Sequence, residues 1–246
     1  MNNIAAIFKR ELAGYFATPV ASVFIFIFLL FLFGLTFFFG FYTGEETDQA
    51  DLQRFFFLHP WIFLFFIPAI SMRLWSEERR VGTIELLMTL PVTTFQAVIG
   101  KFLAAWCFAA LALLLSSSVW ITVNYLGEPD NGVIFAGYLG SFFMAGAYLA
   151  IGAFASALTK NQVISLVLSV LICATFVFAG TDMVADPLGV FLPQVAVDTV
   201  RSFSFLSHFD GITKGLIDLR DVIFFGSLMV CFLFANAIVV DFKKAA

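Results

Sequence analysis

The sequence predicts an all-α integral membrane protein with six transmembrane helices and an N-terminal helix at the membrane interface. Of its 246 residues, 61% are hydrophobic and only 12% are charged, and the mean hydropathy is +1.00. Soluble domains carry about 25% charged and about 45–50% apolar residues. A soluble core of this size could not bury so much apolar surface, so lipid must surround most of the chain. Thirty-five phenylalanines and only seven prolines also exclude a disordered or fibrous chain.

Six apolar stretches are long enough to cross a bilayer, which takes roughly 20 residues in a helix. They are approximately residues 19–41, 55–74, 102–126, 133–158, 162–180 and 222–240. The first stretch is too long for a signal peptide, and no small-residue cleavage site follows it, so we expect it to be retained. The polar stretches are too short to form a second core, so one membrane domain over residues 1–246 is predicted.

The orientation follows from the Lys and Arg residues in alternate loops, because cytoplasmic loops carry the excess. Nine lie on the side of the two termini: Lys9, Arg10, Arg73, Arg79, Arg80, Lys101, Lys160, Lys243 and Lys244. Four lie on the opposite side: Arg54, Arg201, Lys214 and Arg220. Both termini are therefore expected in the cytoplasm.

Residues 1–18 precede the first span and have the pattern of an interfacial helix. Four apolar side chains fall within about 80° of one another on a helical wheel: Ile4, Phe8, Leu12 and Tyr15. Lys9 and Arg10 point elsewhere. Glu11 lies beside the apolar stripe, where a carboxylate is costly unless it is paired. We therefore expect a basic partner for Glu11 on the next loop.

The loop of residues 76–101, between the second and third spans, contains three helix signals. Ser76–Glu78 is typical of a capped helix start with acidic residues near the positive end of the helix dipole. Gly82 should end that helix. Thr83–Leu90 then predicts a short helix that stops at a proline. Thr93–Gln96 has the spacing of a capping box for the helix that enters the third span. The short, partly apolar helix needs a cover, either the bilayer surface or another protein.

The spans carry no Asp, Glu, Lys or Arg at bilayer mid-depth. A proton-driven transporter usually places an ionisable group there, so its absence argues against one. A sodium site built from backbone carbonyls would leave no such mark. His59 is expected to be a hydrogen-bonding residue at the outer interface. Small residues recur in the fourth span and allow close helix packing in lipid: Gly137, Ser141, Ala145, Gly152 and Ser156.

Motifs for catalysis and for nucleotide binding are missing. The only Gly-Lys pair, Gly100-Lys101, is followed by Phe102 and has no glycine-rich loop before it, so no phosphate cradle is expected. With 13 basic and 17 acidic residues there is no basic patch for nucleic acid. The cysteines lie far apart in apolar runs and predict neither a disulfide framework nor a metal cluster: Cys107, Cys173 and Cys231.

Three strings of the sequence are recognisable. The first is Phe8-Lys9-Arg10-Glu11-Leu12, followed by Tyr15-Phe16 and Thr18-Pro19. The second is Glu77-Glu78 with the stretch Gly82–Val92, and the third is Gly100-Lys101-Phe102. Together they resemble the type-2 permeases of ATP-binding-cassette (ABC) transporters, and among these the gliding-motility type. The layout resembles that family over the whole chain, and Gly82–Val92 is the specific part.

The resemblance implies a coupling helix after the second span, which in this family docks in a groove of the ATPase subunit. Here that helix would be Thr83–Leu90. The implied contacts with the ATPase are polar and apolar side chains in and before it: Glu77, Glu78, Arg79, Thr83, Glu85, Leu86 and Leu87. The N-terminal helix would be the connecting helix beside it, with Lys9, Arg10 and Glu11.

The family also has a re-entrant hairpin on the outer side before the last span. In the outer loop of residues 181–220, Val184–Leu206 could supply it, because this stretch is apolar but interrupted by Pro187, Gly189 and Pro193. The alternative is an amphipathic loop at the interface. The loop is too short for a large folded extracellular domain.

By resemblance, the chain is a non-enzymatic permease subunit in the bacterial cytoplasmic (inner) membrane that pairs with a second copy or a related permease, for export. It would hold no cofactor, because ATP and Mg²⁺ would bind a separate ABC ATPase subunit. An accessory periplasmic or membrane subunit is compatible with this layout. Two alternatives stay open: a permease-like anchor or assembly component of a motility or envelope machine, and an ATP-independent secondary transporter or channel.

Overall fold

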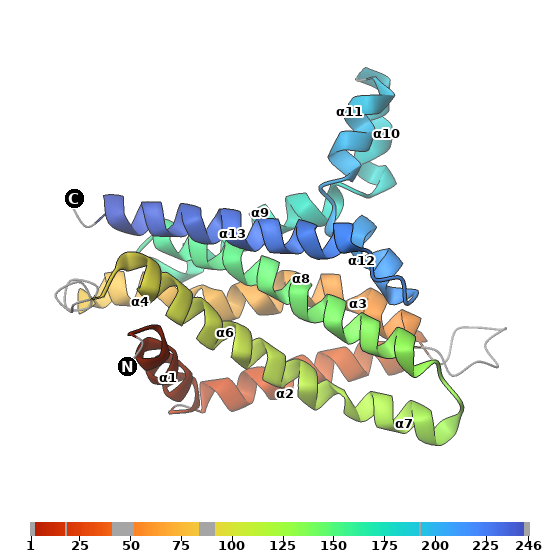
Figure 1. The fold of residues 1–246 in the computed structure, drawn as a ribbon, viewed down its shortest axis with the longest axis horizontal. Coiled ribbons are helices and arrows are strands. Elements are labelled where there is room, and N and C mark those ends of the chain that lie inside the picture. The colour runs from red at the N-terminus through yellow and green to blue at the C-terminus, as the bar shows by residue number, and fades with distance from the viewer. Residues whose placement is uncertain (1–2, 18, 41–51, 84–91, 192, 244–246) are drawn as a thin grey trace.

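The computed structural model describes residues 3–17, 19–40, 52–83, 92–191 and 193–243, which form helices joined by turns (Figure 1). The first half contains α1 (Asn3–Phe16), α2 (Val20–Leu35) with the π-helical turn η1 (Thr36–Gly40), α3 (Gln53–Ser71), α4 (Arg73–Val81), α6 (Thr94–Ser116) and α7 (Ser118–Leu126). The second half contains α8 (Asn131–Leu158), α9 (Gln162–Phe178), α10 (Asp182–Phe191), α11 (Gln194–Arg201), α12 (Phe205–Thr213) and α13 (Leu219–Phe242).

The predicted all-α membrane architecture is confirmed. Within the described residues, five helical stretches are long and apolar enough to cross a bilayer: Ala21–Phe38, Gln53–Val81, Thr94–Leu126, Asn131–Leu158 and Leu219–Phe242. The remaining predicted span, the fifth along the chain, corresponds to α9, whose 17 residues are separated from α10 by a 70° bend. At 1.5 Å per residue, α9 extends for only about 25 Å, so the bend follows a span that is short for a hydrocarbon core of about 30 Å.

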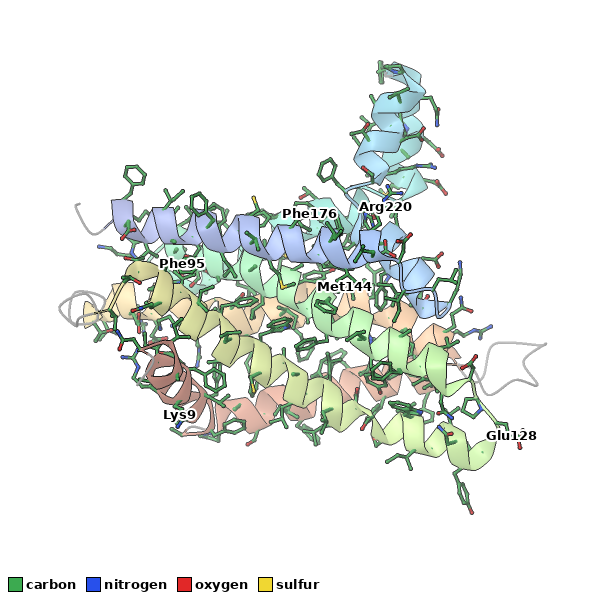
Figure 2. All side chains as sticks on the ribbon, in the orientation of Figure 1. Lys9, Phe95, Glu128, Met144, Phe176 and Arg220 are labelled. Atoms are coloured by element: carbon green, nitrogen blue, oxygen red, sulfur yellow. The ribbon has the colours of Figure 1, made fainter. Side chains whose placement is uncertain are left out.

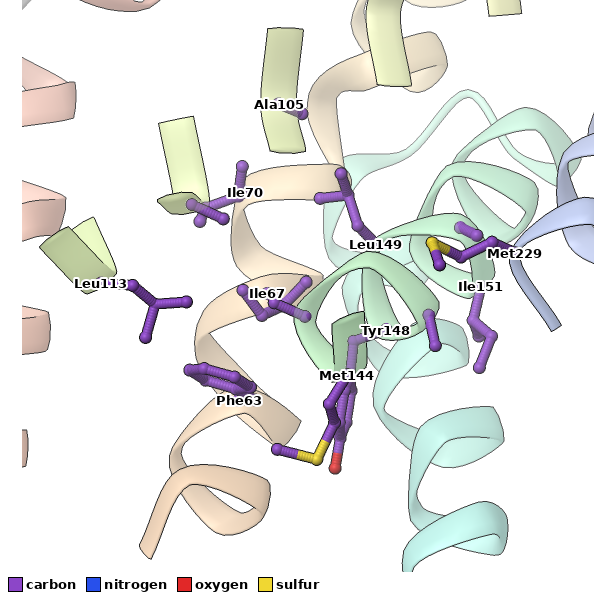
Figure 3. Close-up of a cluster of buried hydrophobic side chains, with 14 of the residues drawn as sticks. Phe63, Ile67, Ile70, Ala105, Leu113, Met144, Tyr148, Leu149, Ile151 and Met229 are labelled. Atoms are coloured by element: carbon purple, nitrogen blue, oxygen red, sulfur yellow. The ribbon is translucent and has the colours of Figure 1, made fainter. Parts of the chain in front are cut away.

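The central helix is α8. In its apolar stretch, 72% of the residues are buried inside the bundle. The corresponding fractions are 22% for α2 and 28% for α13. It contacts α3, α6, α9, α12 and α13, and Figure 3 shows its Met144, Tyr148 and Leu149 among side chains of these neighbours. The outer helices α2 and α13 expose large apolar side chains, as lipid-facing helices do.

The small residues of α8 let α3 approach closely, as predicted. A Cβ atom at Gly137 would lie 2.5 Å from Cε2 of Phe56, and one at Gly152 would collide with Oγ of Ser71. Glycine is therefore required at both positions unless the two helices move apart.

His59 lies in the same contact, where its side chain is fully buried between the helices, and it makes a hydrogen bond, as expected. Its Nδ1 lies 2.7 Å from Oγ of Ser141, which itself donates to the carbonyl oxygen of Gly137 at 2.8 Å. Because a hydroxyl has only one proton to donate, His59 donates from Nδ1 and Ser141 accepts.

The second span continues past the predicted membrane boundary as α4. At the junction, Oγ of Ser156 accepts the backbone N–H groups of Trp75 and Ser76, both at 3.1 Å, and donates to the carbonyl oxygen of Met72 at 2.8 Å. The Ser156 side chain thus inserts at the point where the backbone hydrogen bonds between α3 and α4 are interrupted. Ser76 lies inside this helix and its hydroxyl bonds to Met72, so the prediction that Ser76 caps a helix start was wrong.

A helical hairpin stands before the last span, where the sequence indicated one. Its two helices, α10 and α11, project sideways from the bundle (Figure 1). Arg201 and Asp182 form an ion pair of 2.9 Å at the base of the hairpin. Pro187 lies inside α10 rather than ending it. The 70° bend directs α10 away from the axis of α9.

Candidate functional site

The helix α1, the helix α4 and the C-terminal end of α13 lie together at one end of the bundle, which is called the end of the termini below (Figure 1). At this end α1 lies across α6, and Lys9 is exposed on the outer side of α1 (Figure 2). The far end carries the turn with Glu128 (Figure 2). The chemistry of the site depends on how α1, α4 and α6 are joined.

The helix α1 is packed on α6 by close contacts along its length. A Cβ atom at Gly100 would lie 2.8 Å from Cγ2 of Ile7, so α6 needs glycine there. The ring of Tyr15 stacks on that of Phe108 with centroids 4.9 Å apart. Ile7, which was not in the predicted apolar stripe, is the buried residue of α1.

Lys101 is the buried cation of the site. Its side chain is 2% exposed, and its Nζ lies 2.8 Å from Oε1 of Glu78 and 3.2 Å from Oε1 of Glu11. The same Nζ lies 5.3 Å from the centroid of the Trp75 ring, a cation–π contact. Arg10 also pairs with Glu11, at 2.6 Å. The predicted basic partner of Glu11 is thus confirmed as Lys101, which lies in α6.

Charge sets the ionisation of Glu11. Burial alone would raise the pKa of Glu11, but the nearby Lys101 and Arg10 outweigh it and hold the pKa below its ordinary value. The carboxylate therefore stays ionised and keeps Lys101 between two acids.

Acid should weaken this attachment of α1. Because the pKa of Glu11 is lowered in the folded state, its contribution to stability is present above the ordinary value of 4.5 and is lost as the pH falls through the lower folded-state value. We expect the difference in thermal unfolding midpoint between wild type and Glu11→Gln to shrink below pH 4.5. The exposed Glu128→Gln is the control. An equal shrinkage in both comparisons would contradict the assignment.

Arg79 ties α4 to the end of the central helix. Its Nη1 donates to the carbonyl oxygen of Ala157 at 2.7 Å, and Nζ of Lys243 reaches the same oxygen at 3.4 Å. Cations at the last carbonyls of a helix are favoured by its dipole. Arg79 therefore holds α4 against the end of α8, and Lys243 holds the C-terminal end of α13 against the same turn.

Glu77 makes the next connection. Its carboxylate pairs with Arg80 at 2.7 Å and accepts a hydrogen bond from the side-chain amide of Gln162 at the start of α9. Of the predicted polar contacts with a partner, Glu77, Glu78 and Arg79 thus all have partners within this chain. The sequence could not show this, since every partner except Arg80 lies on another helix, more than 20 residues away in the chain.

The helix α4 ends at Val81, because Gly82 has a left-handed conformation with a φ of +80°, as predicted for a helix break. The predicted loop therefore starts at Gly82 rather than at residue 76. At the other end the capping box of Thr93 and Gln96 is present, as predicted. Thr83 is described, but Glu85, Leu86 and Leu87 belong to residues 84–91, outside the described residues.

Two concave features lie beside these helices. A cavity of about 190 Å³ is formed by α1, α2, α3, α4 and α6, and Arg73, Glu11 and Tyr15 line it. An apolar groove of about 700 Å³ runs between α2, α3 and α9. Phe24 and Ala69 line both. The sequence predicts no role for Arg73 beyond its charge, because only the fold shows that this residue lines a cavity.

The comparison with known families fits this architecture. The model of the ABC-2 family transporter protein matches residues 43–235. This chain belongs to the ABC-2 transporter family. A comparison of this permease with curated proteins found no match. The match runs from before α3 into α13, and it establishes the chain as a multi-pass membrane permease subunit of an ABC transporter. Membership of this family implies a transporter that also contains an ATPase.

Proposed function

We propose that this ABC-2 permease is of the gliding-motility type and couples to a separate ATPase subunit through the segment between α4 and α6. The ion-pair network around Lys101 carries the proposal. It joins the helix before the segment through Glu78, the helix after it through Lys101 itself, and α1 through Glu11. A force applied to the segment would therefore act on three helices together.

The helix α4 has the connections to pass such a force on. Arg79 holds it to the end of α8, and Glu77 holds it to the start of α9. Closure of two ATPase subunits on ATP would then tilt the second span with its neighbours as a rigid body. In this proposal Glu78 and Arg79 transmit the motion from inside the permease, and Glu85, Leu86 and Leu87 contact the ATPase.

The groove between α2, α3 and α9 is proposed as this subunit's half of the translocation path. These helices are the first, second and fifth spans, and the groove is lined almost entirely by apolar side chains such as Val23, Phe65 and Leu171. A second copy of this chain or a related permease would close it. An apolar path suits an amphiphilic substrate better than an ion.

The proposed orientation places both termini in the cytoplasm of a bacterial cell, with the complex exporting across the inner membrane. The excess of Lys and Arg at the end of the termini supports this. ATP and Mg²⁺ would bind the ATPase.

Replacing Glu85 and Leu86 together by Ala should remove the ATPase from the purified complex. Both belong to the short predicted helix, where truncation deletes one charged and one apolar contact of a small interface. The measurement is mass spectrometry of the tagged chain isolated in mild detergent, which should show a stoichiometric ABC ATPase for wild type only.

The matched control is Leu126→Ala with Glu128→Ala, the same pair of residue types at the opposite end of the bundle. The control variant should keep the ATPase. If the wild-type chain came alone under conditions that preserve other membrane complexes, the coupling proposal would fail and an ATP-independent transporter or channel would replace it. An ATPase retained by the Glu85 and Leu86 variant would place the contact elsewhere.

A further inference from the structure

The cavity of about 190 Å³ at the end of the termini combines one charged wall with apolar walls. Arg73 and Glu11 line the charged side, and Phe24, Ile70 and Phe108 line the apolar side. Such a combination suits a ligand that has an ionic and an apolar part.

The charge available to a ligand is that of Arg73. Its guanidinium group makes no hydrogen bond or ion pair with another residue that the structure describes. The acid in the same cavity does not neutralise it, because Glu11 is already held by Lys101 at 3.2 Å and by Arg10 at 2.6 Å. The cavity therefore presents an uncompensated cation.

Tyr15 provides a second polar group. Its ring is fixed by stacking on Phe108, and it lines the cavity. Burial, and next to it the charge of Glu11, raise the pKa of Tyr15, so the hydroxyl stays protonated and can donate to an anion.

We propose that this cavity binds the phosphate headgroup of an anionic phospholipid from the leaflet at the end of the termini. Arg73 would hold the phosphate with its planar fork of N–H donors, which matches phosphate oxygens. The acyl chains would lie past Phe24 and Ala69, which also line the apolar groove of about 700 Å³. Binding itself is independent of the proposed transport function, and only passage of the lipid into the groove would rest on that function.

The first test measures saturable binding of dioctanoyl phosphatidylglycerol to the purified full-length chain in detergent, by native mass spectrometry. Arg73→Gln should weaken binding at least about tenfold, as expected when a charged donor to phosphate is lost. Lys160→Gln is the control, because Lys160 is exposed at the same end but does not line the cavity. Equal affinities of the two variants would overturn the proposal.

The source of the anion is tested with two further probes. Inorganic phosphate should not compete at concentrations where the lipid saturates, and dioctanoyl phosphatidylcholine should bind more weakly than phosphatidylglycerol. Competition by inorganic phosphate would mean a site for a free anion and would overturn the lipid assignment. A co-purified ATPase has no influence on either result.

The second test fills the cavity. A Cβ atom at Gly14 would meet no atom within 4 Å, and Gly14 lines the cavity, so Gly14→Leu should occupy it without straining the protein. Gly34→Leu is the matched control, since a Cβ there also meets nothing within 4 Å but Gly34 lies away from the cavity. The Gly14 variant should lose lipid binding and the Gly34 variant should keep it. The thermal unfolding midpoint should stay unchanged in both. Full binding by the Gly14 variant would contradict the proposed location.

Discussion

Lys101→Met should destabilise the permease by about 3 kcal/mol, because removing one partner of a buried ion pair leaves the other charge uncompensated. The side chain of Lys101 is 2% exposed, while those of Glu11 and Glu78 are each 19% exposed. Since both acids keep some contact with water, the expected loss lies at the lower end of the range of about 3–5 kcal/mol seen for such pairs. Unfolding of the purified chain in a titration with denaturing detergent would measure it.

The control is Lys160→Met, which removes an exposed cation at the same end of the bundle and should change the free energy of unfolding by no more than about 0.5 kcal/mol. Adding Glu11→Gln and Glu78→Gln to Lys101→Met should restore part of the loss, because the two uncompensated carboxylates are then neutral. A loss for Lys101→Met no larger than that of the control would show that the network is not needed for stability.

The triple variant separates the effect of the network on stability from its effect on coupling to the ATPase. If Lys101 also transmits motion, as proposed, the triple variant should be stable and still assemble with the ATPase, but lose ATP-dependent transport. The triple variant lacks the ion pairs of Lys101 with Glu11 and Glu78, which connect α6 to α1 and to α4.

Local signals in the sequence predicted much of this fold. The apolar stretches gave the spans, because lipid leaves few alternatives to a helix of about 20 residues. The capping box of Thr93 and Gln96 and the break at Gly82 were confirmed, since both depend only on neighbouring residues. The expected partner of Glu11 was found as well, because an acid on an apolar stripe demands a cation whatever the fold.

The site was harder to predict, because its geometry depends on contacts between distant helices. Glu77, Glu78 and Arg79 form a charged run that is typical of an exposed surface, yet each bonds to a helix more than 20 residues away. Ser76 has the pattern of a helix cap, but the second span continues through it, with Ser156 bonded to the backbone at that junction. Such contacts leave no trace in local spacing.

Gly152→Ala should destabilise the permease by about 1–3 kcal/mol, the cost of overfilling a close-packed contact. The added methyl group would collide with Oγ of Ser71 and lie 2.7 Å from its Cβ, so α3 and α8 would have to separate. Gly34→Ala is the matched control. A Cβ at Gly34 meets nothing within 4 Å, so alanine there should be neutral or stabilising, by up to about 1 kcal/mol.

A second substitution tests whether the collision is the cause. Ser71→Gly removes the two atoms with which the new methyl group would collide and leaves only Oγ of Ser169 at an ordinary contact distance of 3.7 Å. The double variant should therefore be more stable than the sum of the two single changes predicts. If the two changes were additive, the loss from Gly152→Ala would come from elsewhere. The contact lies next to the junction of α3 and α4 that Ser156 bonds. In the proposed mechanism, motion from the ATPase passes this junction, so Gly152→Ala should also lower transport per ATP hydrolysed, and Ser71→Gly should recover it.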